Sequence, residues 1–168
     1  MTFSIHRASI PVLLRGLANL SGILAKGEAF ATEKNIDPAE LIQASLAPDM
    51  YALARQVQVA SDSAKGCGAR LAGLEPPSFP DTETTFAELC TRIDKTVAFL
   101  KGLTEAQLAG AESRKVTLKL RGREVSFKGD DYLLNFALPN FYFHLTTAYD
   151  ILRHKGVALT KPDFIGGI

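Results

Sequence analysis

The last predicted helix carries two polar side chains that could take part in one site. Asn140 and His144 are four residues apart, so an α-helix places them one above the other on the same face. At 100° per residue, His144 lies about 40° around this helix from the apolar residue Ala148, so its ring is expected at the edge of the interior. On an earlier predicted helix, Gln56 precedes Val57 and also leans inward. The three polar side chains could therefore meet between facing helices.

Three interpretations of this polar set stay open. A neutral imidazole is a good ligand for a divalent metal such as zinc or nickel, whereas amide oxygens are weak ligands for it. His144, Asn140 and Gln56 could form a metal site, line a polar pocket for a small molecule, or satisfy one another in a buried hydrogen-bonded network. Tyr149 could add a hydroxyl group to such a pocket. The weakness of two of the three donors favours the network over the metal site.

The other histidines and the cysteines are weaker candidates for functional residues. His6 is one turn before an apolar position and could border a pocket, whereas His154 falls at the negative end of the last helix. Cys67 and Cys90 lie on apolar stripes without a histidine partner, so we expect inert buried thiols. Two cysteines are too few for a disulfide framework, and free thiols fit a reducing cytoplasm.

Charged residues offer ion pairs or a clamp for an anionic ligand. Arg55 and Arg153 could pair with Asp62 or Asp150, and paired surface charges are the commoner outcome. Gln58 is not expected to lean inward. The sequence has no recognisable catalytic triad, phosphate-binding loop or HExxH motif, so no motif points to a reaction.

The elements that must position these side chains are mainly helices. Apolar residues recur at helical spacing in four long segments, and stretches containing proline or glycine separate them. The predicted long helices run from about Ile10 to a stop at Asn35, from Met50 to about Leu71, from the capping box at Thr85 to Gly102, and from about Asp130 to Lys155. Short helices are expected after Asp37 and Thr104.

Other stretches break the helical pattern. Three prolines between residues 74 and 81 exclude a helix and predict an extended crossover. From residue 115 to 128 the apolar period falls to two around Arg121 and Gly122, which predicts a β-hairpin. Pro139 should kink or restart the last helix, and Phe164 could anchor the tail. The predicted core seam of that helix is Leu134, Leu138, Phe141, Leu145, Ala148 and Leu152.

Gly66 and Gly68 fall within one turn of the second long helix. Glycine destabilises a helix by about 1 kcal/mol relative to alanine, so such a pair indicates a close helix contact or a nearby ligand. Close helix packing is the simpler explanation.

Length and composition exclude several classes of protein. The 168 residues suit a single domain spanning 1–168, and a hydrophobic fraction of 46% excludes intrinsic disorder. Nineteen basic and 18 acidic residues nearly balance, so neither nucleic acid nor an anionic membrane is expected as the main partner. No uninterrupted apolar stretch approaches the roughly 20 residues that span a bilayer. We therefore expect an all-α, cytoplasmic four-helix bundle with a small β-hairpin between helices three and four.

Several stretches of the chain resemble the DUF1993 family, which is grouped with the DinB-like proteins. The matching segments are Ala47–Met50, Arg55–Gln58, Gly73–Pro77, Phe86–Leu89, Leu138–His144, Thr147–Arg153 and Lys161–Phe164. They span nearly the whole chain, and the Leu-Pro-Asn-Phe-Tyr-Phe-His string is quite specific. The resemblance implies an up-down-down-up four-helix bundle, a long crossover between helices two and three, and frequently a homodimer.

Many DinB-like proteins bind a divalent metal through three histidines, and some act as thiol-dependent transferases or hydrolases. Their two last-helix histidines match Asn140 and His144 here, and Gln56 is the better match for the histidine of helix two. Only one of the three imidazoles is present. The resemblance therefore predicts a degenerate metal site in a protein that binds a small ligand or partner without a cofactor. A metal-dependent enzyme that uses His144 is the alternative.

Overall fold

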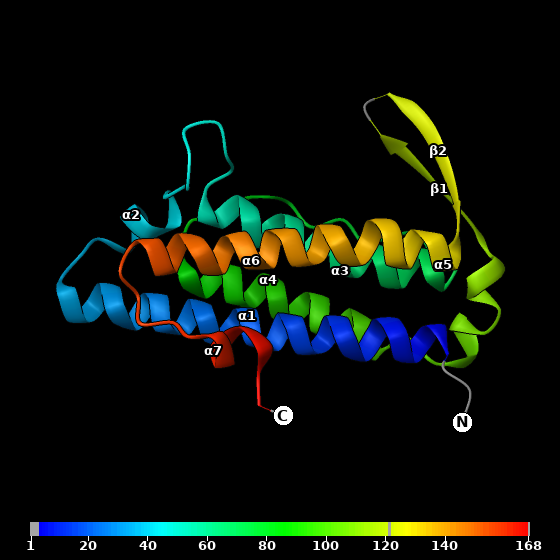
Figure 1. The fold of residues 1–168 in the computed structure, drawn as a ribbon, viewed down its shortest axis with the longest axis horizontal. Helices are drawn as coiled ribbons and strands as arrows, with labels where there is room; N and C mark the ends of the chain where they lie inside the picture. The colour runs from blue at the N-terminus through cyan, green and yellow to red at the C-terminus, as the bar shows by residue number, and fades with distance from the viewer. Residues whose placement is uncertain (1–3, 121, 168) are drawn as a thin grey trace.

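Four long helices make up most of the structure, a computed structural model that describes residues 4–120 and 122–167 (Figure 1). They are α1 (Ile5–Lys34), α3 (Leu53–Leu71), α4 (Phe86–Lys101) and α6 (Leu138–His154). In Figure 1, α1 and α6 run in one direction, and α3 and α4 run in the opposite one. α3 packs against α6 and α4, and α1 packs against α4 and α6. The buried faces of all four contribute to one apolar core.

The helix boundaries mostly follow local capping signals. Asn35 ends α1 in the left-handed conformation, with φ of 55°, and Asp37 caps the short helix α2 (Pro38–Ile42) by accepting from the Ala39 N–H. Thr85 and Glu88 form the predicted reciprocal capping box at the start of α4. These predicted boundaries are confirmed.

The start of α3 differs from the sequence prediction, which placed it at Met50. The helix begins at Leu53, whose N–H donates to the carbonyl of Ala44 (2.9 Å). The side-chain amide of Gln56 donates to the carbonyl of Tyr51 (3.0 Å). Both bonds hold the preceding loop in a non-helical conformation, which the apolar pattern alone did not indicate.

The last long helix is interrupted as Pro139 predicted. A short helix, α5 (Gly129–Tyr132), leads into the π-helical turn η3 (Leu133–Ala137), and α6 follows. Pro139 has no N–H to donate to the carbonyl four residues earlier, and the chain accommodates this break with the wider turn.

This π-helical turn corrects one predicted core position. Leu134, placed in the core seam by its spacing, is 59% exposed. Leu133 and Ala137 are buried instead, in line with Phe141 on α6. The wider turn takes in one residue more than an α-helical turn, so it shifts which residues face the interior.

A two-stranded antiparallel sheet joins α4 to α5. Its strands are β1 (Lys115–Leu120) and β2 (Arg123–Lys128), with Leu118 opposite Val125. Gly122 has φ of 81°, as a tight hairpin turn requires, whereas Arg121 of the predicted turn lies outside the described residues. The short helix expected after Thr104 is a single 3-10 turn, η1 (Ala106–Leu108), and a second one follows, η2 (Ala111–Ser113).

The C-terminal tail packs on α1. It forms a short helix that the sequence did not predict, α7 (Lys161–Ile165), whose capping box joins Thr160 and Asp163. The Phe164 ring packs edge-to-face on Tyr149 of α6 at 5.9 Å, and its carbonyl accepts from the Asn19 side-chain amide (2.9 Å). Phe164 therefore anchors the tail, as predicted.

Among the described helices, α1 alone has the length and composition to cross a membrane. Its most apolar 18-residue window has a mean hydropathy of 1.4. The core helix of a folded domain passes the same test, and α1 places ten buried residues against the other helices. Its apolar character is explained by this packing.

Candidate functional site

His144 and Gln56 form a buried hydrogen-bonded pair between α6 and α3. The His144 Nδ1 lies 2.7 Å from the Gln56 Oε1, and the Gln56 Nε2 donates to the carbonyl of Tyr51 (3.0 Å). Because the Gln56 amide nitrogen donates to the Tyr51 carbonyl, the amide oxygen faces the imidazole and must accept a hydrogen bond from the Nδ1–H. This arrangement places a proton on Nδ1 of His144, so the neutral ring has its lone pair on Nε2.

The surroundings of His144 favour its neutral form. Burial lowers the pKa of the imidazole below its ordinary value, and the positive charge of Arg55 lowers it further. At neutral pH the ring is therefore uncharged, and its remaining proton is the one on Nδ1 that is donated to Gln56.

Asn140 does not join this pair. Its Nδ2 donates to the carbonyl of Phe136 (2.6 Å), inside the π-helical turn, and no hydrogen bond with Gln56 or His144 is formed within the described residues. The structure thus brings together two of the three predicted polar side chains. The third, Asn140, donates to a backbone carbonyl next to the break that Pro139 causes.

The remaining candidates lie elsewhere. Tyr149 packs on Phe164 and is about 140° around α6 from His144, so it points to another side of the helix. His154 is about 15 Å further along α6 than His144. His6 does border a pocket, as the sequence allowed, but this cavity of about 540 Å³ lies between the start of α1 and the η1–η2 segment.

These donors do not fit a zinc or nickel ion. The Gln56 oxygen is occupied by the imidazole proton, and amide oxygens are weak ligands for such metals. Within residues 4–120 and 122–167, no three or more His, Cys, Asp or Glu side chains are grouped so that they could hold a metal ion. His144 contributes a single strong donor, which is too few to hold such an ion.

Both thiols are protonated at neutral pH, in agreement with inert cysteines. Burial raises the pKa of Cys67 to about 12. Burial also raises the pKa of the half-buried Cys90, and the nearby carboxylates of Glu28 and Asp94 add to the effect. Neither thiol is activated as a nucleophile.

A cavity of about 450 Å³ lies beside the Gln56–His144 pair, bordered by α3, the crossover, β1 and the α5–α6 region. Asn140, one turn before His144, lines it, but Gln56 and His144 do not. Within the cavity lining, the Arg70 Nη1 donates to the Tyr132 hydroxyl oxygen (3.2 Å). The apolar part of its wall includes Val59, Leu74, Leu118, Phe136 and Ala137. We call this space the α3–α6 cavity.

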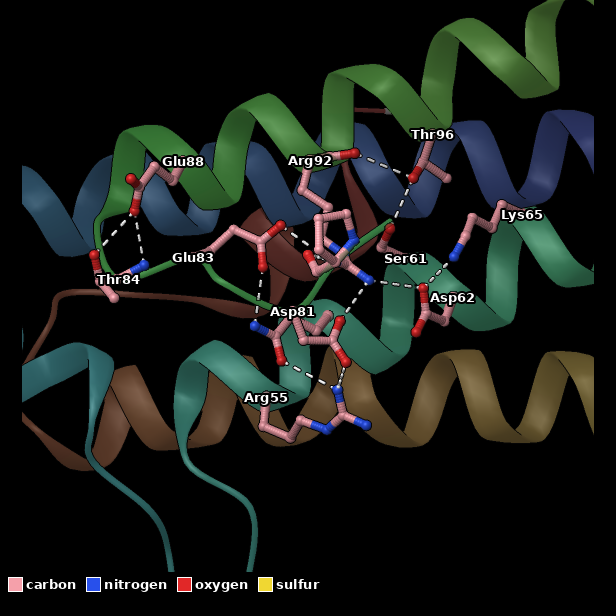
Figure 2. Close-up of polar contacts among 12 residues, drawn as sticks. Arg55, Ser61, Asp62, Lys65, Asp81, Glu83, Thr84, Glu88, Arg92 and Thr96 are labelled. Atoms are coloured by element: carbon pink, nitrogen blue, oxygen red, sulfur yellow. Dashed lines mark hydrogen bonds and ion pairs between the residues drawn. The ribbon is translucent and has the colours of Figure 1, made fainter. Parts of the chain in front are cut away.

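A buried arginine organises the other side of α3. Arg92 of α4 is 1% exposed, and its guanidinium lies 2.8 Å from Asp62, 2.9 Å from Asp81 and 3.0 Å from Glu83 (Figure 2). It also donates to the carbonyl of Pro80 (3.0 Å). Burial acts to lower the pKa of Arg92, but the bonds to Glu83 and Asp62 outweigh it and raise that pKa, so the group stays charged.

We call these contacts the Arg92 cluster, and its members are Arg92, Asp62, Asp81, Glu83, Arg55, Gln58 and Lys65. The cluster corrects two expectations. Gln58 is buried, because the crossover covers it and its amide donates to Glu83 (3.0 Å). Arg55 pairs with Asp81 of the crossover, whereas Asp62 pairs with Arg92 and Lys65 (Figure 2). The prolines of the crossover indicated an extended path, but not which helices its carboxylates would reach.

Sequence reasoning overlooked Arg92 itself. A usable signal exists: Arg92 shares a helical face with Leu89, Ile93 and Thr96, all of them buried. A charged residue on an apolar face needs a partner of opposite charge, and acidic residues stand at 81 and 83 in the crossover.

Comparison with known proteins agrees with this fold. The family model described as a domain of unknown function, DUF1993, matches residues 5–165. A crystal structure of a DinB family member protein from Shewanella denitrificans is 39% identical in sequence and superposes with a TM-score of 0.91, covering 98% of this chain and 93% of that chain. A search of curated proteins found no match. Over almost its whole length, the chain therefore belongs to the DUF1993 family and is similar in structure to a DinB family member.

Proposed function

We propose that this protein is a cytoplasmic, DinB-like, up-down-down-up four-helix bundle that binds a small molecule in the α3–α6 cavity. The observation that carries the proposal is the cavity itself. Its volume of about 450 Å³ is in the usual range for small-molecule sites, and its wall combines apolar side chains with polar and charged ones in comparable number.

The polar groups of the α3–α6 cavity are available to a ligand. Asn140 uses its amide nitrogen for Phe136, and its amide oxygen has no hydrogen-bond partner in the parts of the chain that the structure describes. Asn140 can therefore accept a hydrogen bond from a ligand. The neighbouring Gln56–His144 pair has a supporting role, because it fixes α6 against α3 beside the cavity.

Titration of small fragments into ¹⁵N-labelled protein tests this proposal. Ligands of the α3–α6 cavity should shift the backbone amide signals of Asn140, Phe136 and Arg70 and leave those of α7 unchanged. Ser63→Phe should block binding, since Ser63 lines the cavity, whereas Ser113→Phe, at an exposed position outside it, should not. Fragments that bind Ser63→Phe as well as the wild type would exclude the α3–α6 cavity.

Metal analysis separates this proposal from a metal-dependent enzyme. Protein purified without chelators should contain neither zinc nor nickel in stoichiometric amount, because the donors at His144 do not fit these ions. One equivalent of either metal that disappears in His144→Ala would favour the enzyme instead.

The proposal includes a homodimer, which the family resemblance implies. Tyr51 and Phe143 are exposed by 56% and 57%; the Tyr51 carbonyl accepts from Gln56, and the Phe143 ring packs edge-to-face on His144 at 5.1 Å. Exposed aromatic side chains of this size are typical of protein interfaces. We place the contact between two copies on this face.

A further inference from the structure

Two groups in the α3–α6 cavity have donors that the protein does not use. Tyr132 is 1% exposed, and its oxygen accepts from Arg70, so its own proton is left without an acceptor among the described residues. The half-buried guanidinium of Arg70 forms this one hydrogen bond and no ion pair within residues 4–120 and 122–167. The cavity therefore contains an uncompensated positive charge next to a free hydroxyl donor.

Gly66 allows Arg70 to take this position. The two residues are one helical turn apart, and the guanidinium folds back over the glycine. A Cβ added at Gly66 would collide with the Arg70 Nη1. Of the two glycines that the sequence singled out, this one is explained by the cavity.

The acidic side chains of the cavity do not neutralise Arg70. Asp62 is engaged by Arg92 and Lys65 on the other side of α3. Glu75 lines the cavity, but it is exposed and pairs with no described cation. A second cation, Lys119 on β1, is also exposed and offsets the charge of Glu75, so the charge of Arg70 is left in excess and favours an anion.

We propose that the α3–α6 cavity binds an organic anion, whose carboxylate accepts hydrogen bonds from Arg70 and Tyr132 while its apolar part contacts Phe136 and Leu118. This inference rests on the proposed function and adds the class of ligand. A guanidinium and a neighbouring hydroxyl form a strong pair of donors for a carboxylate. Burial raises the pKa of Tyr132 to about 12, so its hydroxyl keeps the proton that it donates.

A matched pair of probes tests the class of ligand. 3-Phenylpropionate and 3-phenylpropanamide have the same apolar part and nearly the same shape, but only the first is an anion. Titrated into ¹⁵N-labelled protein, both should shift amide signals around Phe136 and Asn140. The carboxylate should bind at least about tenfold more tightly, as expected for charge-assisted hydrogen bonds.

Three variants test the donors. Arg70→Gln and Tyr132→Phe should each reduce the preference for 3-phenylpropionate over its amide. Gly66→Ala should do so without loss of charge, because it displaces the guanidinium. Arg15→Gln, an equal charge change at an exposed position of α1, should leave the preference unchanged. The amide spectrum of each variant shows whether it folds. If Arg70→Gln does not fold, Gly66→Ala tests the role of Arg70 in its place.

The outcomes separate this inference from the proposed function. If both probes bind equally well to the wild type, the anion preference is refuted while the cavity remains a binding site. A preference that survives in Arg70→Gln or Gly66→Ala refutes the role of Arg70. If neither probe shifts the cavity signals, the inference fails, and the fragment titration with Ser63→Phe decides the proposed function.

Discussion

His144 and Gln56 form a hydrogen bond at two positions for which the family resemblance implies metal ligands. Helical spacing alone predicted that both lean inward, and the structure joins them at 2.7 Å. The partner of Asn140 was not predictable in this way, because its bond to Phe136 depends on the π-helical turn. The spacing of four residues fixes a shared face of a helix but not the bond that each side chain makes.

His144→Ala should lower the free energy of unfolding by about 1–3 kcal/mol, because it leaves the buried Gln56 oxygen without a partner. Urea denaturation followed by circular dichroism measures the change. His154→Ala, at an exposed position of the same helix, is the control and should be close to neutral. Equal urea midpoints for wild type and His144→Ala would contradict the buried pair.

Stability should depend on pH through His144. Burial, with a contribution from Arg55, lowers its pKa in the folded protein below the unfolded value of about 6.5. The unfolded state then binds the proton more readily than the folded state. The contribution of His144 to the free energy of unfolding is therefore complete above about pH 6.5 and is lost as the pH falls toward the folded pKa. Wild type should lose more stability than His144→Leu over this interval, measured by urea denaturation. Parallel pH profiles would refute this.

At the scale of elements, the Arg92 cluster fixes the crossover to α3 and α4. The crossover begins where α3 ends and returns along its length to the start of α4 (Figure 1). Its prolines prevent regular structure, and Arg92 supplies the bonds that hold it through Pro80, Asp81 and Glu83. The charged residues of the cluster lie in separate parts of the sequence, so local patterns did not predict their ion pairs.

Arg92→Met should lower the free energy of unfolding by about 3 kcal/mol, because it leaves the largely buried carboxylate of Glu83 without a cation, whereas Asp62 and Asp81 keep Lys65 and Arg55. It should also speed proteolysis between residues 72 and 85. Arg55→Met removes a partner of the same Asp81 from a more exposed pair, so it should cost less than about 1 kcal/mol. Similar losses for the two variants would show that burial of Arg92 is not what fixes the crossover.

Gly68 sits where α3 approaches α4. A Cβ there would lie 2.5 Å from the Leu100 Cδ2 and 2.8 Å from the Leu103 Cδ1. Gly68→Ala should therefore destabilise the protein by about 1–3 kcal/mol. Gly22→Ala on α1, where a Cβ meets no atom within 4 Å, should instead stabilise it by about 0.5–1 kcal/mol. Thermal unfolding compares them, and a stabilised Gly68→Ala would refute the close approach.

The same scale shows why one core position was mispredicted. The seam spacing from Leu134 onward assumes an unbroken α-helix. The π-helical turn before Pro139 changes the phase, so Leu133 replaces Leu134 in the core. Proline predicts a break, but its effect on register depends on how the chain accommodates it.

At the scale of the whole molecule, helix periodicity and caps predicted the long helices and the hairpin. These features depend on neighbouring residues, which the sequence displays directly. The α3–α6 cavity instead depends on how α3, the crossover, β1 and the α5–α6 region meet. No local pattern contains that arrangement, so Arg70 and Tyr132 did not stand out.

The protein should sediment as a dimer, with twice the chain mass of 18.2 kDa. Phe143→Lys should shift it to monomer, because a charge would be buried against the partner copy. Leu134→Lys changes a side chain of similar exposure in η3, outside the proposed contact, and should leave the dimer intact. Wild type that stays monomeric at all concentrations, or a dimer that is unaffected by Phe143→Lys, would contradict the proposed interface.

The Arg92 cluster has a consequence for how the sequence can change over time. Replacing Arg92 alone leaves three acidic partners behind, and replacing Glu83 alone removes one of its bonds at a buried position. Single steps are therefore unfavourable in either direction. In related chains, Arg92 and Glu83 should be inherited together or exchanged together for apolar residues, and this covariation should link α4 to the crossover.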